Sequence, residues 1–168
     1  MKKAVEIERK FVILLPDISS LEDLDGYSRS EIEQIYLESE QGRTHRIRSR
    51  RFDGATVYTE TEKIRIDAIS AFENEKKIDY RRFSELRARQ RKDSRVIEKT
   101  RITFRFGERL FEVDVYPEWK RTAIMEVELP ARDTEVDLPP FIEIVKEVTG
   151  DKAYSNASMS CTFPKELI

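Results

Sequence analysis

Val5-Glu6-Ile7-Glu8-Arg9-Lys10-Phe11 opens the chain with an alternation of side-chain type. A β-strand turns successive side chains to opposite faces, so Glu6, Glu8 and Lys10 share one face. The opposite face carries the apolar residues of the stretch. An extended segment with one apolar face and one fully charged face predicts a strand that borders two different environments.

The same alternation recurs along the chain, and acids and bases are sorted onto different segments. Pairs of like charge share a strand face at Glu6/Glu8, Arg46/Arg48, Glu73/Glu75, Lys99/Arg101, Glu112/Asp114 and Glu126/Glu128, and Lys63 shares a face with Thr61. An ordinary sheet with one solvated face is the simplest interpretation of each segment taken alone. For the whole set, faces that are mostly charged and sorted by sign favour two facing walls.

Eight segments have strand character, and they predict a closed barrel. These segments are 5–15, 34–37, 44–50, 56–66, 72–78, 95–106, 109–116 and 123–129. Eight strands enclose a space wide enough for side chains or one small ligand. Helices are expected over 16–24, 79–92 and 138–149, with a helical turn at 29–32. The predicted fold is therefore α+β: one domain over 1–168, an eight-stranded antiparallel β-barrel with a charged lumen and helices packed outside.

Composition limits the chemistry. The 168 residues include 31 Lys and Arg against 33 Asp and Glu, a net charge of −2 that argues against a general nucleic-acid binder. One cysteine, Cys161, and one histidine, His45, exclude a disulfide framework and multi-histidine sites. No segment has the ~20 apolar residues of a membrane span, and the first residues lack the apolar core of a signal peptide. We therefore expect a cytoplasmic protein without a membrane partner or a required nucleic acid.

Buried charges are costly unless they are paired or ligated, so a lumen with this many charges predicts a highly charged ligand. Arginine and lysine bind anionic oxygens, and clustered carboxylates bind hard cations. Together they point to a metal–polyphosphate complex.

The motifs resemble those of the CYTH superfamily, the triphosphate tunnel metalloenzymes. The resemblance begins at Glu6-Ile7-Glu8-Arg9-Lys10-Phe11 and runs in order over nearly the whole chain. It continues through 34–37, Arg46-Ile47-Arg48, Thr61-Glu62-Lys63, Glu73-Asn74-Glu75, Lys99-Thr100-Arg101, 111–114, 126–129, 148–151 and Tyr154-Ser155-Asn156. The 148–156 stretch resembles the bacterial, tripolyphosphatase-like branch. Two departures are Ala71 and Ala153, where family members often have arginine.

The resemblance implies metal-dependent hydrolysis of a triphosphate, most simply inorganic tripolyphosphate, with nucleoside triphosphates as further candidates. Two alternatives stay open: a class IV-type adenylate cyclase that makes cyclic AMP from ATP, and a non-catalytic polyphosphate-binding module. A homodimer also stays open.

Residue types assign the expected roles. Arginine pairs with phosphate through two hydrogen bonds and lysine acts as a point charge, whereas Mg²⁺ and Mn²⁺ favour carboxylate oxygens. Substrate binding is expected from Arg46, Arg48, Lys63, Lys99 and Arg101, and two metal ions from Glu6, Glu8, Asp114, Glu126 and Glu128. Lys10, Glu73 and Glu75 are expected to take part in catalysis.

Overall fold

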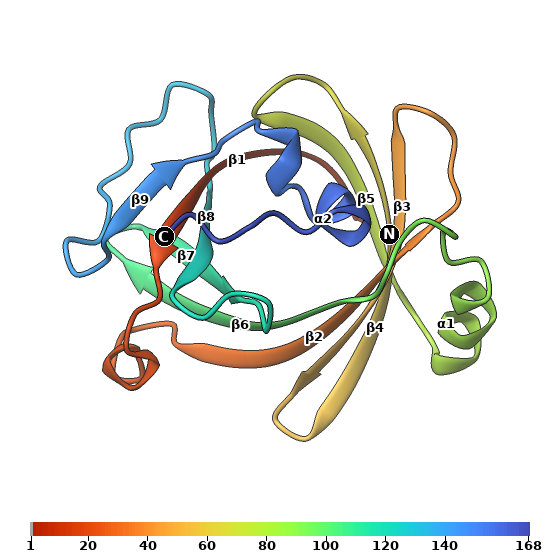
Figure 1. Cartoon of the computed structure of the whole chain (residues 1–168), viewed down its shortest axis with the longest axis horizontal. Coiled ribbons are helices and arrows are strands. Elements are labelled where there is room, and N and C mark those ends of the chain that lie inside the picture. Colours follow the sequence, from red (N-terminus) through yellow and green to blue (C-terminus); the bar gives the residue numbers. More distant parts are fainter. Residues whose placement is uncertain (1) are drawn as a thin grey trace.

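The computed structural model describes residues 2–168, and of Lys2 and Lys3 only the backbone. Nine strands form one antiparallel sheet in the order β5-β4-β3-β2-β6-β7-β8-β1-β9, and a further pairing between β5 and β1 closes it into a barrel. The strands are β1 (Lys2–Leu14), β2 (Ser28–Leu37), β3 (Arg43–Phe52), β4 (Ala55–Arg65), β5 (Ser70–Ile78), β6 (Ile97–Phe106), β7 (Arg109–Val115), β8 (Thr122–Glu128) and β9 (Ile144–Glu147). The predicted eight-stranded barrel is confirmed, and β9 is an addition to it (Figure 1).

The opening strand β1 closes the barrel because it serves two neighbours. Its residues 2–7 pair with β5, and its residues 8–14 pair with β8 on the other edge. Once β5 has ended, the free edge of β1 at Phe11–Ile13 takes up β9. The charged and apolar faces of the opening stretch therefore become the inside and the outside of the barrel.

Two predicted elements are wrong. The residues predicted as a helical turn at 29–32 belong to β2, where the side chains of Ser30 and Ile32 are buried. The predicted helix over 138–149 is instead β9 with its flanking loops, because Ile144 and the residues after it pair with β1. In β9, the backbone N–H and C=O groups of this segment are satisfied by pairing with the free edge of β1.

The apolar outer face is covered by short elements. A 3-10 helix, η1 (Ile18–Leu21), buries Leu21 in a cluster with Phe11, Phe104 and Phe111. The helix α1 (Tyr80–Arg87) is shorter than the predicted 79–92 and starts at Asp79, whose side chain accepts from the Arg82 backbone N–H at 2.8 Å. It packs Phe83 and Leu86 over β2 and β3.

One end of the barrel is closed by the C-terminal segment. A 3-10 helix, η2 (Lys152–Tyr154), leads into α2 (Asn156–Cys161), which the sequence patterns did not predict. Met159 of α2 packs with Val12 of β1, Ile124 of β8 and Tyr116, which directly follows β7. In Figure 1, α2 lies within the ring of strands, whereas α1 lies outside it. Across residues 2–168, no helix has the length and apolar character needed to cross a membrane.

Candidate functional site: a charged cavity inside the barrel

The inner strand faces enclose a cavity of about 230 Å³. Eleven of the thirteen residues predicted to share one lumen line it: Glu6, Glu8, Lys10, Arg46, Arg48, Lys63, Glu73, Glu75, Lys99, Arg101 and Glu126. They come from β1, β3, β4, β5, β6 and β8. Residues far apart in the sequence therefore meet because each contributes the inward face of its strand.

Asp114 and Glu128 do not line this cavity. Asp114 is buried beneath it, and both of its oxygens accept from cations. Glu128 lies opposite Glu8 in the strand register, yet its side chain is exposed. The expectation that both carboxylates reach the shared cavity is not met.

Lys99 and Arg101 on β6 are paired with Asp114. Lys99 Nζ lies 2.7 Å from Asp114 Oδ2, and Arg101 donates to both oxygens at 2.7 and 2.9 Å. Arg101 also donates to Glu112 at 2.6 Å. Burial alone raises the pKa of Asp114, but Arg101 and Lys99 hold that pKa well below its usual range. Asp114 is therefore ionised and holds two cations in place under the cavity.

Lys10 on β1 and Lys63 on β4 are paired as well. Lys10 Nζ lies 3.3 Å from Glu126 Oε1 and donates to the Tyr154 carbonyl oxygen at 3.2 Å. Lys10 therefore contacts the C-terminal segment that closes one end of the barrel. Lys63 Nζ lies 2.7 Å from Glu6 Oε2 and 4.0 Å from Glu73 Oε2. Each lysine therefore neutralises part of the acidic side of the cavity.

The two lumen arginines of β3, Arg46 and Arg48, form no ion pair with a carboxylate among the described residues. Arg48 donates twice to the neutral Oε1 of Gln34, at 2.9 and 2.7 Å. The Arg46 Nε–H is buried without any hydrogen-bond acceptor among the described residues. Burial, together with the charges of Arg46 and Arg101, lowers the pKa of Arg48. The β3 side of the cavity therefore carries positive charge that a bound anion would neutralise.

Carboxylates crowd the opposite side. Burial and the charge of Glu126 raise the pKa of Glu8 to about 8, and no ion pair of Glu8 is found in the described part of the chain. Burial and a hydrogen bond with Glu6 raise the pKa of Glu73 to about 7. Burial and neighbouring carboxylates disfavour the charged form of these two groups, and a divalent cation would favour it. Their oxygens are the donors that Mg²⁺ and Mn²⁺ prefer, so the residues fit the expected metal.

Several cavity residues were not among the predicted site residues. Glu112 lines the cavity and pairs with Arg101, although its place in the charged face of β7 is visible in the sequence. Arg65 lies directly across from Ala71 in the register of β4 and β5 and also lines the cavity. Where family members carry arginine at the Ala71 position, this chain places a guanidinium on the neighbouring strand. Ala153, the other departure, is exposed.

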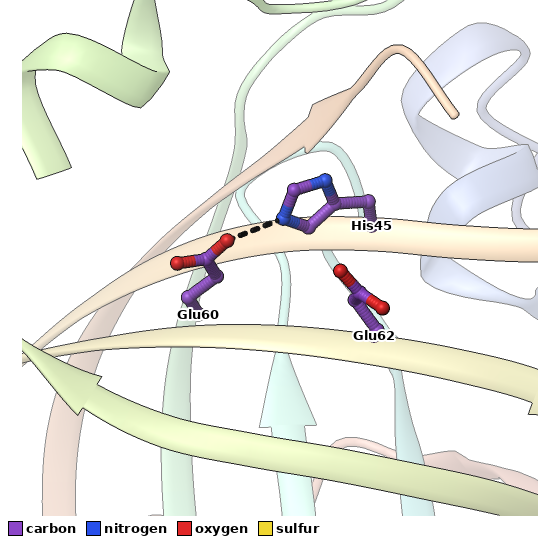
Figure 2. Close-up of side chains that lie close together, drawn as sticks. All are labelled: His45, Glu60 and Glu62. Atoms are coloured by element: carbon purple, nitrogen blue, oxygen red, sulfur yellow. Dashed lines mark hydrogen bonds and ion pairs between the residues drawn. The ribbon is translucent and has the colours of Figure 1, made fainter. Parts of the chain in front are cut away.

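A second acidic group lies on the outer face of β3 and β4. His45 Nε2 lies 2.8 Å from Glu60 Oε2, and the ligand atoms of His45, Glu60 and Glu62 lie within 4.8 Å of one another (Figure 2). The Glu60 carboxylate also pairs with Arg82 at 3.4 Å and with Lys76 at 3.7 Å. Because these cations already compensate Glu60, we interpret the group as an ion-pair network that fastens α1 to the barrel.

The chain resembles solved structures over most of its length. No protein-family model matches it, and no curated protein sequence matches it significantly. The crystal structure of the inorganic triphosphatase NE1496 has a TM-score of 0.60 at 28% identity, covering 95% of this chain and 97% of that one. PH1819 from Pyrococcus horikoshii OT3 has a TM-score of 0.58 at 23% identity, covering 76% and 80%.

A further neighbour is HpAC1 from Hippeastrum, described as a putative adenylyl cyclase with a dominant triphosphatase activity. It has a TM-score of 0.55 at 16% identity, covering 75% of this chain and 80% of that one. At these identities the Pyrococcus and Hippeastrum proteins show the fold alone. The closed antiparallel barrel, its charged lumen and its likeness to NE1496 support the predicted resemblance to the CYTH superfamily, the triphosphate tunnel metalloenzymes.

Proposed function

We propose that the chain is a metal-dependent triphosphatase that hydrolyses inorganic tripolyphosphate in preference to nucleoside triphosphates. The observation that carries the proposal is the division of the cavity into a cationic side, where Arg46 and Arg48 have no ion-paired carboxylate, and an acidic side, where Glu8 faces the cavity without an ion pair among the described residues. A polyphosphate supplies the missing negative charge on the first side, and a divalent cation supplies the missing positive charge on the second. The activity that NE1496 is named for agrees with this assignment.

Glu6, Glu8 and Glu126 would hold the metal, because they come from two paired strands and their carboxylates face the same cavity. A bound Mg²⁺ or Mn²⁺ supplies charge neutralisation at the phosphate oxygens and acidifies a water molecule. We propose two such ions.

The protein's own residues bind and orient the phosphate chain. Arg46 and Arg48 donate to phosphate oxygens through planar guanidinium groups, which suit paired acceptors. Lys63, Lys99 and Arg101 add charge from the neighbouring walls, and Asp114 acts as a positioning residue that fixes two of these cations. In phosphoryl transfer, positioning and electrostatic stabilisation account for nearly all of the catalysis.

Lys10, Glu73 and Glu75 are assigned to orienting the reacting phosphate and the attacking water. Lys10 is held between Glu126 and the Tyr154 carbonyl, and Glu75 Oε1 accepts from Thr61 Oγ1 at 3.0 Å. Held side chains lower the cost of ordering the reactants, because their geometry is set before the substrate binds.

We expect a higher kcat/KM for tripolyphosphate than for ATP. The cavity is small and lined by charged side chains. Its arginine and lysine side chains bind phosphate oxygens and add no binding energy for a nucleoside. The test is a phosphate-release panel of tripolyphosphate, ATP, thiamine triphosphate and pyrophosphate, each with Mg²⁺ and with Mn²⁺. ATP turned over as well as tripolyphosphate would contradict the substrate assignment. Cyclic AMP among the chromatographed products would identify a cyclase, and binding without turnover would identify a non-catalytic module.

Glu128→Gln is expected to change the metal-dependent kcat/KM by no more than about threefold, since an exposed carboxylate outside the cavity makes a weak electrostatic contribution. The same assay at saturating and limiting Mg²⁺ measures it. A hundredfold loss of kcat/KM, or a large rise in the Mg²⁺ concentration needed for the half-maximal rate, would show that Glu128 contributes to metal binding.

A further inference from the structure

A second pocket continues the lumen at the end of the barrel that α2 does not close. Its volume is about 430 Å³, and it is lined by Arg48, Arg50, Phe52, Val57, Thr59, Glu75, Lys76 and Lys77. It shares Arg48 and Glu75 with the lumen cavity, so the two spaces are neighbours along one passage. We call these eight residues and the space between them the mouth pocket.

The mouth pocket holds cations without carboxylate partners within the described residues. Arg50 donates through Nε to Ser30 Oγ at 3.0 Å, and its guanidinium carbon lies 5.7 Å from the centre of the Phe52 ring. These two contacts orient Arg50 and leave its remaining N–H groups available. Lys77 is exposed at the same mouth, whereas its neighbour Lys76 pairs with Glu60 at 3.7 Å. The contrast with Lys10, Lys63 and Lys99, which are all paired, marks these charges as available to a ligand.

The spacing of the arginines exceeds the length of a triphosphate. Arg46, Arg48 and Arg50 occupy alternate positions of β3 and face inward, so the row spans about 13 Å at the rise of an antiparallel strand. Neighbouring phosphorus atoms in a polyphosphate are closer together than one residue step of a strand. A triphosphate held by Arg46 and Arg48 therefore leaves Arg50 and Lys77 for phosphates further along the chain.

We propose that the mouth pocket binds the fourth and later phosphates of a linear inorganic polyphosphate, so that this chain favours polyphosphates longer than tripolyphosphate. The inference rests on the proposed function of the lumen. Water adds to the terminal phosphorus in the lumen, and the bond from that phosphorus to its bridging oxygen breaks. Orthophosphate and a chain shorter by one phosphate leave the reaction, the bridging oxygen becomes the new terminal anion, and one proton passes to solvent.

A nucleoside at the mouth is the competing occupant, because Phe52 and Val57 are 40% and 39% exposed. Arg50 already occupies one face of the Phe52 ring, and a base needs an aromatic face for stacking. Two arginines and two lysines, of which only Lys76 pairs with a carboxylate among the described residues, also favour an anion over a neutral base. The charge of the mouth pocket therefore supports further phosphates.

The test compares Arg50→Gln/Lys77→Gln with the matched control Arg51→Gln/Lys92→Gln. The control removes the same two charges from exposed positions, Arg51 on the outer face of β3 and Lys92 in a loop. The substrates are tripolyphosphate, a linear polyphosphate of defined mean length well above five phosphates, and ATP, with phosphate release measured at equal free Mg²⁺. Thermal midpoints verify that each variant is folded.

For Arg50→Gln/Lys77→Gln we expect the ratio of kcat/KM for long polyphosphate over tripolyphosphate to fall about tenfold or more, because each lost charged hydrogen bond weakens binding by about tenfold. Tripolyphosphate alone should fall by no more than about threefold, and the control should keep the wild-type ratio within about twofold. An unchanged ratio with continued tripolyphosphate hydrolysis would contradict polyphosphate binding at the mouth pocket and leave the proposed function intact. A loss confined to ATP also overturns it, in favour of a nucleoside.

If the wild type hydrolyses none of the three substrates, the proposed function fails, and calorimetry in EDTA still tests the mouth pocket. Tighter binding of long polyphosphate than of tripolyphosphate, lost in Arg50→Gln/Lys77→Gln and kept in the control, supports the pocket. Equal affinities of wild type and variant for long polyphosphate overturn it.

Discussion

Glu8→Gln is expected to lower metal-dependent kcat/KM by about a hundredfold to a thousandfold and, in EDTA, to stabilise the protein at pH 8. Glu8 faces the lumen without an ion-pair partner in the described part of the chain, so among the lumen acids it is the most available metal ligand. Glutamine keeps the size of the side chain and removes the charge that binds a hard cation. Activity and stability should therefore move in opposite directions.

The sign of the stability effect follows from the pKa of Glu8. Burial and Glu126 raise that pKa to about 8 in the folded protein, so the folded state disfavours the charged form. The resulting cost is absent at pH values below the ordinary range of a carboxyl group and grows as the pH rises toward 8. Removing the group should raise the free energy of unfolding by about 2–4 kcal/mol at pH 8 and by little at pH 4.

Denaturant unfolding in EDTA at pH 4, 6 and 8 measures this dependence, with Glu128→Gln as the control. Glu128 lies opposite Glu8 in the register but is exposed, so its variant should show no comparable gain. Near-normal turnover of Glu8→Gln would remove Glu8 from the metal site. A destabilised variant at pH 8 would show that its charge is compensated in the folded protein.

The inner wall of the barrel could be predicted from the sequence because strand alternation is local. Once Glu6, Glu8 and Lys10 are known to face one way, closure of the sheet decides only whether that way is in or out. Paired charges on six of the eight segments made an interior ligand site the more consistent interpretation, and eleven of the thirteen predicted residues line the cavity. The short outer helices matter little to that inference.

The closure of one end could not be predicted, because it depends on contacts between distant segments. Met159 belongs to a six-residue helix with little pattern of its own, and it is fixed by packing against Val12 and Tyr116. In the same way, β9 forms because the edge of β1 is free there, which no local pattern reveals. Asp114 shares the charged face of β7, but its depth under Lys99 is a matter of packing.

Asp114→Asn is expected to cost about 3–5 kcal/mol of folding stability, the largest stability loss we expect from a single lumen substitution. The Lys99 side chain is 0% exposed, and the Asp114 carboxylate is the anion that it and Arg101 share. Asparagine keeps the shape and leaves two buried cations without that charge. Because Arg101 and Lys99 hold the pKa of Asp114 well below its usual range, against the effect of burial, the contribution is present at and above that range. It is lost in acid, and because burial lowers the pKa of Lys99 to about 7, the deficit of the variant should also be smaller at pH 8 than at pH 5.

Glu112→Gln is the matched control, since Glu112 also pairs with Arg101, at 2.6 Å, but its side chain is 34% exposed. Burial raises the pKa of Glu112, so its charge is not favoured by the fold and its loss should cost less than about 1 kcal/mol. Denaturant unfolding in EDTA compares the two variants. Added tripolyphosphate should restore more stability to Asp114→Asn than to the wild type, because a bound anion supplies the negative charge that Lys99 and Arg101 have lost. Equal stabilities of the two variants, or equal rescue of variant and wild type, would show that Lys99 and Arg101 do not depend on Asp114 for their place at the cavity.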